Sequence, residues 1–164
     1  MSRYLVAVID GTQARFLTLE PVEFEGHESG PNLVEHSGLH SAAKEMQGQE
    51  LWANVKTGRN RGSSGQAHGY DDHRQNHLIE FERRFAQSIA GRLAELAQVH
   101  QARQLILVAE PQILGLMREA MSAHSLRQLS VQDIAKDLCR LSPRALHDYL
   151  AERSLLPAYQ RAVV

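Results

Sequence analysis

The chain has 164 residues, enough for one compact domain and too few for two ordinary domains joined by a linker. Its 18 Lys and Arg against 19 Asp and Glu give a formal net charge of −1, so the overall composition does not indicate a basic nucleic-acid-binding protein. The single cysteine, Cys139, excludes an internal disulfide and a multi-cysteine zinc site. No apolar run approaches the roughly 18 residues of a membrane-spanning helix, and no signal-peptide pattern is visible, so we expect a cytoplasmic protein without membrane contact.

The beginning of the sequence predicts an antiparallel sheet. Residues 4–9 are continuously apolar, which is typical of a central strand covered on both faces. Asp10-Gly11 is a turn pair, and residues 14–20 then form the second strand of a hairpin. We expect a third antiparallel strand over residues 32–36.

The next segment, about residues 38–72, lacks regular hydrophobic periodicity. Five of the 11 glycines lie between Gly48 and Gly69. Long irregular segments inside a compact domain are usually functional loops or disordered. We therefore expect a long loop here and look for function in it first.

The rest of the chain predicts alternating helices and strands. Asp72 is a candidate N-cap, with Gln75 in the capping-box position, for a long helix over about residues 73–100. The elements expected after it are a buried strand over 104–109, a helix from Pro111, an edge strand over 129–134 and a helix capped by Ser142 before Pro143.

This order predicts a single α/β domain over residues 1–153. Its mixed sheet has about five strands, with an N-terminal hairpin followed by right-handed β-α-β crossovers, a ribonuclease-H-like arrangement. Residues 154–164 form an apolar tail that docks on the domain or on a second copy of the chain, which would give a homodimer.

Four ordered motifs resemble the bacterial host-attachment protein family: Asp10-Gly11 with Ala14-Arg15-Phe16, Leu107-Val108-Ala109-x-Pro111-x-x-Leu114-Gly115-x-x-Arg118, Lys136-Asp137-Leu138, and Leu141-Ser142-Pro143-x-x-Leu146. That family is in turn distantly similar to the ribonuclease-H-like central domain of archaeal and eukaryotic class-1 release factors and of Pelota. The resemblance implies a release-factor-like domain that acts at the ribosome.

One local motif extends this resemblance. The segment Gly62-Ser63-Ser64-Gly65-Gln66 stands before the long helix, where release factors carry a Gly-Gly-Gln loop. Ser64 replaces the first glycine of that triplet, so we expect contact with RNA rather than peptidyl-tRNA hydrolysis.

The residues around this motif favour a polyanion. Lys56, Arg59 and Arg61 precede it, and no acidic residue lies between Val55 and Tyr70. Arg and Lys neutralise phosphates, and glycines let backbone N–H groups approach them. We expect these residues, together with those of the motif, to bind RNA or the ribosome; the alternative is a solvated loop with incidental charges.

A second candidate site is a metal centre. His73 and His77 are spaced i, i+4, so both rings can point to one side of a helix and bind zinc or nickel with Asp72. The His-Glu-x-x-His motif is absent, and the same spacing extends the apolar stripe of the helix, so packing explains it equally well.

A third candidate is a pair of carboxylates at strand ends. Asp10 and Glu110 each follow a predicted central strand, where together they could hold a divalent metal for phosphodiester cleavage. The alternatives are a turn residue and the residue before a proline-started helix. We also expect Asp137 to pair with Lys136, and Cys139 to be an unreactive core thiol.

The leading hypothesis is a non-enzymatic domain that contacts RNA or the ribosome and needs no cofactor. Two alternatives remain open at this point. One is a metal-dependent nuclease or phosphodiesterase, and the other is a homodimeric protein-interaction module.

Overall fold

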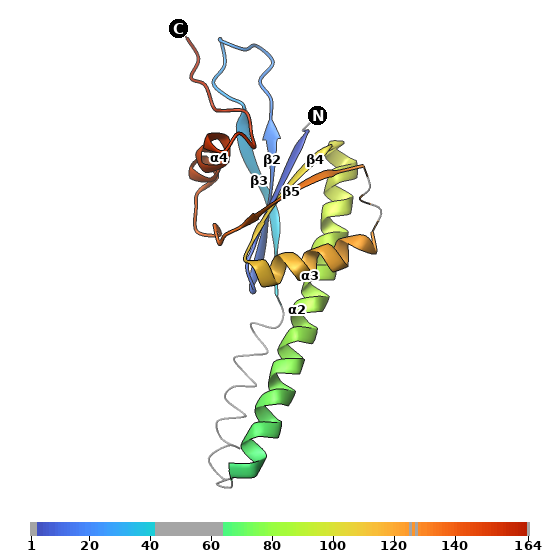
Figure 1. Cartoon of the computed structure of the whole chain (residues 1–164). Helices are drawn as coiled ribbons and strands as arrows, with labels where there is room; N and C mark the ends of the chain where they lie inside the picture. Colours follow the sequence, from blue (N-terminus) through green and yellow to red (C-terminus); the bar gives the residue numbers. More distant parts are fainter. Residues whose placement is uncertain (1–2, 42–63, 125, 127, 164) are drawn as a thin grey trace.

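The computed structural model describes residues 3–41, 64–124, 126 and 128–163, except for the side chains of residues 64–79 and of Phe81. This part of the chain forms a five-stranded mixed sheet with helices on both faces (Figure 1). The predicted α/β class and strand number are therefore confirmed.

The sheet has the strand order β3-β2-β1-β4-β5. Neighbours pair antiparallel from β3 to β1 and parallel from β1 to β5. This order is compatible with the predicted ribonuclease-H-like arrangement. The strands are β1 (Tyr4–Ile9), β2 (Gln13–Glu20), β3 (Asn32–His40), β4 (Gln104–Ala109) and β5 (Ser130–Ala135).

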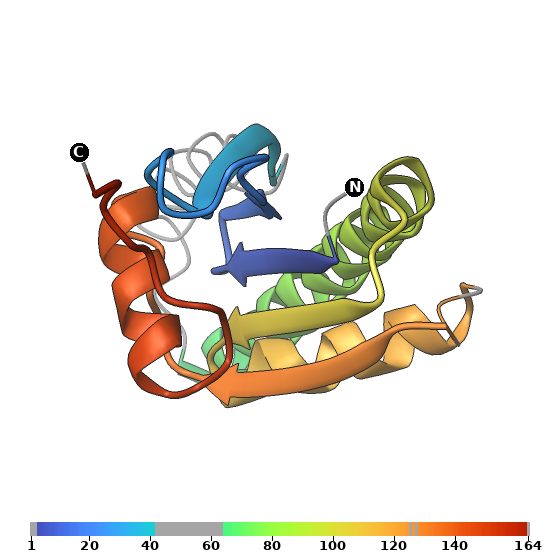
Figure 2. The same ribbon diagram turned by 90° about the horizontal axis from the view of Figure 1, so that it is seen from above.

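The two faces of the sheet are covered by different helices. Helices α2 (Ser64–His100) and α3 (Pro111–Ser122) pack on one face, and α4 (Pro143–Glu152) lies on the other (Figures 1 and 2). Side chains alternate between these faces along β1, as expected for a pleated strand. Leu5 contributes to the core under α2 and α3, whereas Val6 contributes to the core under α4.

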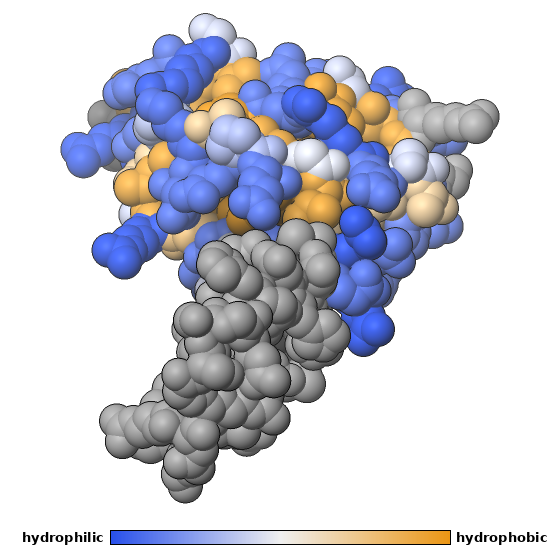
Figure 3. Space-filling view, turned by 60° about the horizontal axis from the view of Figure 1, so that its bottom comes forward, coloured by the Kyte–Doolittle hydropathy of each residue, from blue (hydrophilic) through white to orange (hydrophobic). Residues whose placement is uncertain are grey.

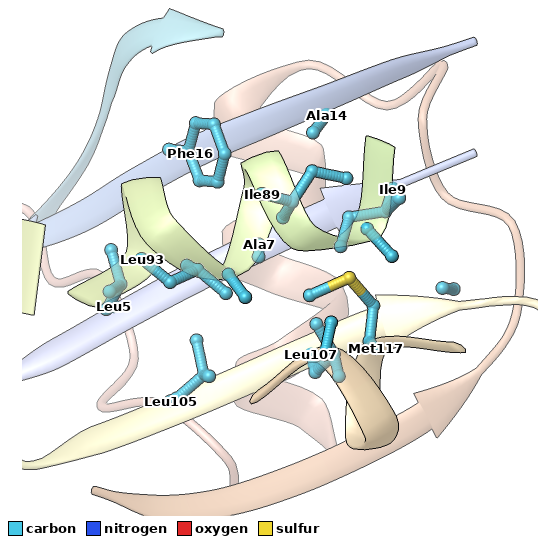
Figure 4. Close-up of a cluster of buried hydrophobic side chains, with 14 of the residues drawn as sticks. Leu5, Ala7, Ile9, Ala14, Phe16, Ile89, Leu93, Leu105, Leu107 and Met117 are labelled. Atoms are coloured by element: carbon cyan, nitrogen blue, oxygen red, sulfur yellow. The ribbon is translucent and has the colours of Figure 1, made fainter. Parts of the chain in front are cut away.

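The larger core lies between the sheet and the first pair of helices. Phe16 from β2, Leu107 from β4, Ile89 and Leu93 from α2, and Met117 from α3 meet there (Figure 4). All five side chains are fully buried. The continuous apolar runs of the central strands are explained by this burial on both faces.

Helix α2 is longer than the sequence predicted. It begins at Ser64 rather than at residue 73, so Asp72 lies inside the helix and is not its N-cap. The expected loop over residues 38–72 is therefore wrong at both ends, because β3 continues to His40 and residues 64–72 are helical. Figure 1 shows the N-terminal half of α2 extending well beyond the sheet.

The expected start of the last helix is confirmed. The Ser142 hydroxyl accepts a hydrogen bond from the backbone N–H of Ala145 at 3.1 Å, and Pro143 occupies the first helical position. A side-chain cap followed by proline is a typical local indicator of a helix start.

The C-terminal tail packs on its own chain. Leu156 is buried in the core under α4, and the His147 ring nitrogen Nε2 lies 2.7 Å from the Pro157 carbonyl oxygen. Gln160 exchanges two backbone hydrogen bonds with Gly30 in the β2–β3 connection, at 2.9 and 3.0 Å. Of the two docking partners expected for the tail, its own domain is the one observed here, and a homodimer stays a prediction.

Candidate functional site at the carboxyl ends of the strands

The parallel strands β1, β4 and β5 all end at the same edge of the sheet. Asp10 follows β1, Glu110 follows β4, and Asp137 lies two residues beyond β5. Polar residues beyond the carboxyl ends of parallel strands are a common position for functional sites in α/β proteins. This edge also lies on the side of the molecule toward which α2 extends (Figure 1).

Asp10 organises the turn between β1 and β2. Its Oδ1 atom accepts hydrogen bonds from the backbone N–H of Thr12 at 2.7 Å, from the Thr12 hydroxyl at 2.8 Å and from the backbone N–H of Gln13 at 2.8 Å. Partial burial raises the pKa of Asp10, but these bonds and one from Cys139 outweigh it, so the pKa lies below its ordinary value. The carboxylate is thus held in its charged form.

Asp10 meets Asp137 and Cys139 at this edge. One ligand atom of each residue lies within 4.8 Å of the others. The backbone N–H of Cys139 donates to Asp137 Oδ1 at 3.1 Å. Burial and the two neighbouring carboxylates raise the pKa of the Cys139 thiol to about 12. Cys139 is therefore a neutral thiol and not a nucleophile, in keeping with the unreactive residue expected.

Arg15 holds the same segment from the other side. Its guanidinium donates to the carbonyl oxygens of Cys139 at 3.0 Å and Leu141 at 2.7 Å, and it forms a two-point pair with Glu35 at 2.7 and 3.0 Å. The register between β2 and β3 shifts at Arg15, between Ala14 and Phe16. Asp10 and Arg15 together fasten the β5–α4 connection to the N-terminal hairpin.

The donor set decides which metals this edge could bind. Two carboxylates suit Mg²⁺ or Mn²⁺, whereas a buried cysteine suits a softer ion such as Zn²⁺ and must first lose its proton. A cavity that Asp10 lines, between the β1–β2 turn, α2 and α3, has a volume of only about 10 Å³. That is room for about one water molecule, and neither Asp137 nor Cys139 lines this cavity. Figure 3 brings this edge forward and shows hydrophobic patches among hydrophilic residues.

The other predicted site residues do not join this cluster. Glu110 is exposed immediately before α3 and is not among the grouped ligands in the described chain. Lys136 and Asp137 contact residues other than each other. The Asp137 carboxylate accepts a hydrogen bond from the backbone N–H of Cys139, and the Lys136 ammonium lies 5.6 Å from the centre of the Tyr149 ring.

The structure describes only some of the candidate residues on and before α2. Ser64, Gly65 and Gln66 form the first turn of the helix. The candidate ligands Asp72, His73 and His77 lie within the helix, in the part whose side chains are outside the description. Lys56, Arg59, Arg61, Gly62 and Ser63 lie outside the described residues.

A known protein family matches most of the chain. The profile of a family described as "Protein required for attachment to host cells" matches residues 5–150. The chain belongs to this family. The match spans β1 to α4 and so includes the Asp10 turn, the whole of α2 and the Cys139 segment of this host-attachment-family protein. No curated protein matches the chain.

A helix that spans a membrane needs about 20 consecutive, mainly apolar residues. Among the described residues of the host-attachment-family protein, no helix is both long enough and apolar enough to cross a bilayer.

Proposed function

We propose that this host-attachment-family protein contacts RNA, free or in the ribosome, through the far end of α2 and the basic segment that precedes it. The observation that carries the proposal is the position of the first turn of α2. This turn contains no acidic residue and lies at the end of the helix that extends away from the sheet (Figure 1).

The length of α2 supports a role in reaching a partner. The described residues of α2 in the main core lie between Phe85 and Ala97. At 1.5 Å per residue, the roughly 20 residues before them extend the helix by about 30 Å. Such an extension adds nothing to the described core, but it carries its N-terminus away from the body of the protein.

The chemistry at that end favours phosphate. A helix N-terminus presents free backbone N–H groups and the positive end of the helix dipole, which together bind anions. Lys56, Arg59 and Arg61 stand just before it in the sequence and would add three charges for the RNA backbone. Ser64 and Gln66, which align with the release-factor triplet, would lie at the contact.

We expect the protein to bind RNA without catalysing a reaction on it. Ser64 stands where the release-factor triplet has its first glycine, and the closest approach of a backbone to a ligand requires glycine. A requirement for attachment to host cells, which the family description states, would then be an indirect consequence of RNA binding.

Filter binding with a single-stranded RNA at several salt concentrations tests the proposal. Each phosphate contact contributes about 0.7 to the slope of log K against log salt, so Arg59→Ala/Arg61→Ala should lower the magnitude of the slope by about 1.4 and weaken binding. Arg118→Ala/Arg140→Ala, which removes two exposed arginines outside α2, is the matched control and should bind like wild type. Equal affinity and slope in the double variant and wild type would contradict the proposal.

A second candidate function is metal-dependent phosphodiester cleavage, which the convergence of Asp10 and Asp137 favours. Two carboxylates at the carboxyl ends of strands can hold Mg²⁺ or Mn²⁺ against a phosphate. In this form of the proposal Asp137 takes the role that the sequence suggested for Glu110.

Incubation with RNA and DNA in Mg²⁺ or Mn²⁺ separates the two candidates. Cleavage that is lost in both Asp10→Asn and Asp137→Asn, but kept in Glu110→Gln, would establish the second. Binding without cleavage in wild type would leave contact alone as the function.

A further inference from the structure

A larger cavity lies at the opposite edge of the sheet from Asp10. It has a volume of about 700 Å³ and lies where β1 and β4 begin and β2 ends. The β2–β3 connection and the C-terminal tail form its outer walls, and these two segments run side by side in Figures 1 and 2. This volume falls within the range of small-molecule sites, about 300–1,000 Å³.

The outer wall of the cavity is fixed by hydrogen bonds. Besides the two bonds between Gln160 and Gly30, the backbone N–H of Ala162 donates to the Ser29 hydroxyl at 2.9 Å and that of Val163 donates to the Gly26 carbonyl at 2.9 Å. Gly30 is needed here, because a Cβ at this position would lie 2.5 Å from a methyl group of Val22. These bonds hold the two segments of the outer wall together.

Three arginines line the cavity. Arg3 and Arg103 precede the paired strands β1 and β4, and the backbone N–H of Arg103 donates to the Arg3 carbonyl at 3.0 Å. Arg161 comes from the tail wall. Within the described part of the chain, none of the three guanidinium groups forms an ion pair, although six other arginines do.

Neighbouring like charges without a counterion are unfavourable, and an anion between them relieves the repulsion. Arginine pairs bind phosphate and carboxylate groups at two points, because the planar guanidinium fits their geometry. The first two arginines, whose backbones are hydrogen-bonded at the start of β1 and β4, are therefore the part of the lining best suited to an anion.

The outer wall of the cavity has different chemistry. Glu25 and Glu28 from the β2–β3 connection line it, and a Glu28 carboxylate oxygen already accepts from the backbone N–H of Glu23 at 3.2 Å. Carboxylates accept hydrogen bonds from hydroxyl or amino groups. Leu19, Val22 and Pro157 also line the cavity and supply apolar contact.

We propose that this cavity binds a small organic phosphate whose body carries hydroxyl or amino groups, with the phosphate on Arg3 and Arg103. The volume is too large for inorganic phosphate alone, and the two glutamates would repel a ligand that is anionic at both ends. A sugar phosphate or a nucleoside monophosphate has the required combination.

Calorimetric titration of the full chain with two matched pairs of probes tests this: ribose 5-phosphate against ribose, and AMP against adenosine. We expect at least one phosphorylated probe to bind with a Kd of about 1 mM or tighter, and at least tenfold more tightly than its unphosphorylated partner. If neither phosphorylated probe reaches this affinity, or if the phosphate makes no difference, the proposal is overturned.

Two variants locate the binding. Arg3→Ala/Arg103→Ala should weaken it by about tenfold or more, because charge-assisted bonds to the phosphate are lost. Ala158→Trp, at an exposed position of the tail wall, should block the cavity without changing its charge. Arg118→Ala/Arg140→Ala, which also removes two exposed arginines, is the control for net charge, and unchanged thermal unfolding of each variant shows that it is folded. Retained binding in either test variant would overturn the proposal.

This site is independent of the proposed RNA contact, because the two lie at opposite ends of the sheet. The cavity variants should bind RNA like wild type, and Arg59→Ala/Arg61→Ala should bind the small phosphate like wild type. Either proposal can therefore fail without the other.

Discussion

At the scale of single residues, the buried Cys139 thiol couples the Asp10 turn to the segment before α4. The folded state raises its pKa from 9.0 to about 12, because it is buried and faces Asp10 and Asp137. A group whose pKa is raised on folding contributes its full stability below the unfolded pKa and loses it as the pH rises toward the folded pKa. This contribution is present at neutral pH and falls away above about pH 9.

Chemical unfolding across this range gives a direct measurement. We expect the free energy of unfolding of wild type to fall more steeply between about pH 9 and pH 11 than that of Cys139→Ser, which has no titrating thiol at this position. The two proteins share all other titrating groups, so the difference in slope reports Cys139. Parallel profiles would show that the thiol is not held in its neutral form by the fold.

Arg15 is the residue on which the same segment depends most. Arg15→Ala should lower the free energy of unfolding by about 2 kcal/mol, because it leaves the Glu35 carboxylate and two carbonyl groups without their charged donor. Arg118→Ala removes an ion pair with Asp133. The Arg118 side chain is 68% exposed, so this substitution should lower the free energy of unfolding by less than about 1 kcal/mol. Urea unfolding of both variants compares them; equal losses would contradict a special role for Arg15.

The Asp10 cluster illustrates how far residue-level prediction reaches. Asp10 could be selected from the sequence because a turn pair follows an apolar strand. Its partners Asp137 and Cys139 could not be selected in this way, because no local sequence pattern connects residues more than 120 positions apart. Lys136-Asp137 suggested a local ion pair, and only the path of the chain from β5 to α4 brings the carboxylate to Asp10 instead.

At the scale of elements, the strands and the later helices follow from the sequence and the start of α2 does not. Continuous apolar runs predicted β1 and β4, and Ser142-Pro143 predicted α4. Gly65 and Gly69 each disfavour a helix by about 1 kcal/mol relative to alanine, so local propensity predicted a loop there. Extending an existing helix requires no new nucleation, however, and α2 continues through both glycines.

A charge placed in the first turn of α2 separates folding from RNA binding. Ser64→Asp should stabilise the helix slightly, because a carboxylate interacts favourably with the positive end of the dipole. The same carboxylate should repel RNA phosphates and weaken RNA binding by severalfold. Circular dichroism and filter binding on the same variant measure the two effects; undiminished binding would argue against an RNA contact at this turn. Ser64→Asn, which is neutral, is the matched control.

At the scale of the whole molecule, the C-terminal tail completes one core and one cavity. Leu156 is 5% exposed under α4, and Val163 near the end of the tail is 80% exposed. Leu156→Ala should lower the free energy of unfolding by about 3 kcal/mol, as is usual for a buried leucine, whereas Val163→Ala should change it by less than about 0.5 kcal/mol.

Light scattering on the same proteins tests the alternative role of the tail. If the tail serves its own domain, wild type and Leu156→Ala have the same mass in solution, and only stability differs. A wild-type dimer that Leu156→Ala converts to a monomer would instead indicate that the tail joins two copies.

The molecule thus has two candidate binding ends, the extended N-terminus of α2 and the arginine-lined cavity. The Asp10 cluster lies at the edge of the sheet toward which α2 extends. Photochemical cross-linking tests the proposed RNA contact. The full chain is bound to a single-stranded RNA carrying photoreactive uridines, irradiated, and digested, and the cross-linked peptides are identified by mass spectrometry. We predict cross-links within residues 56–66, and their loss in Arg59→Ala/Arg61→Ala. Cross-links confined to the arginine-lined cavity or to the Asp10 edge would contradict it.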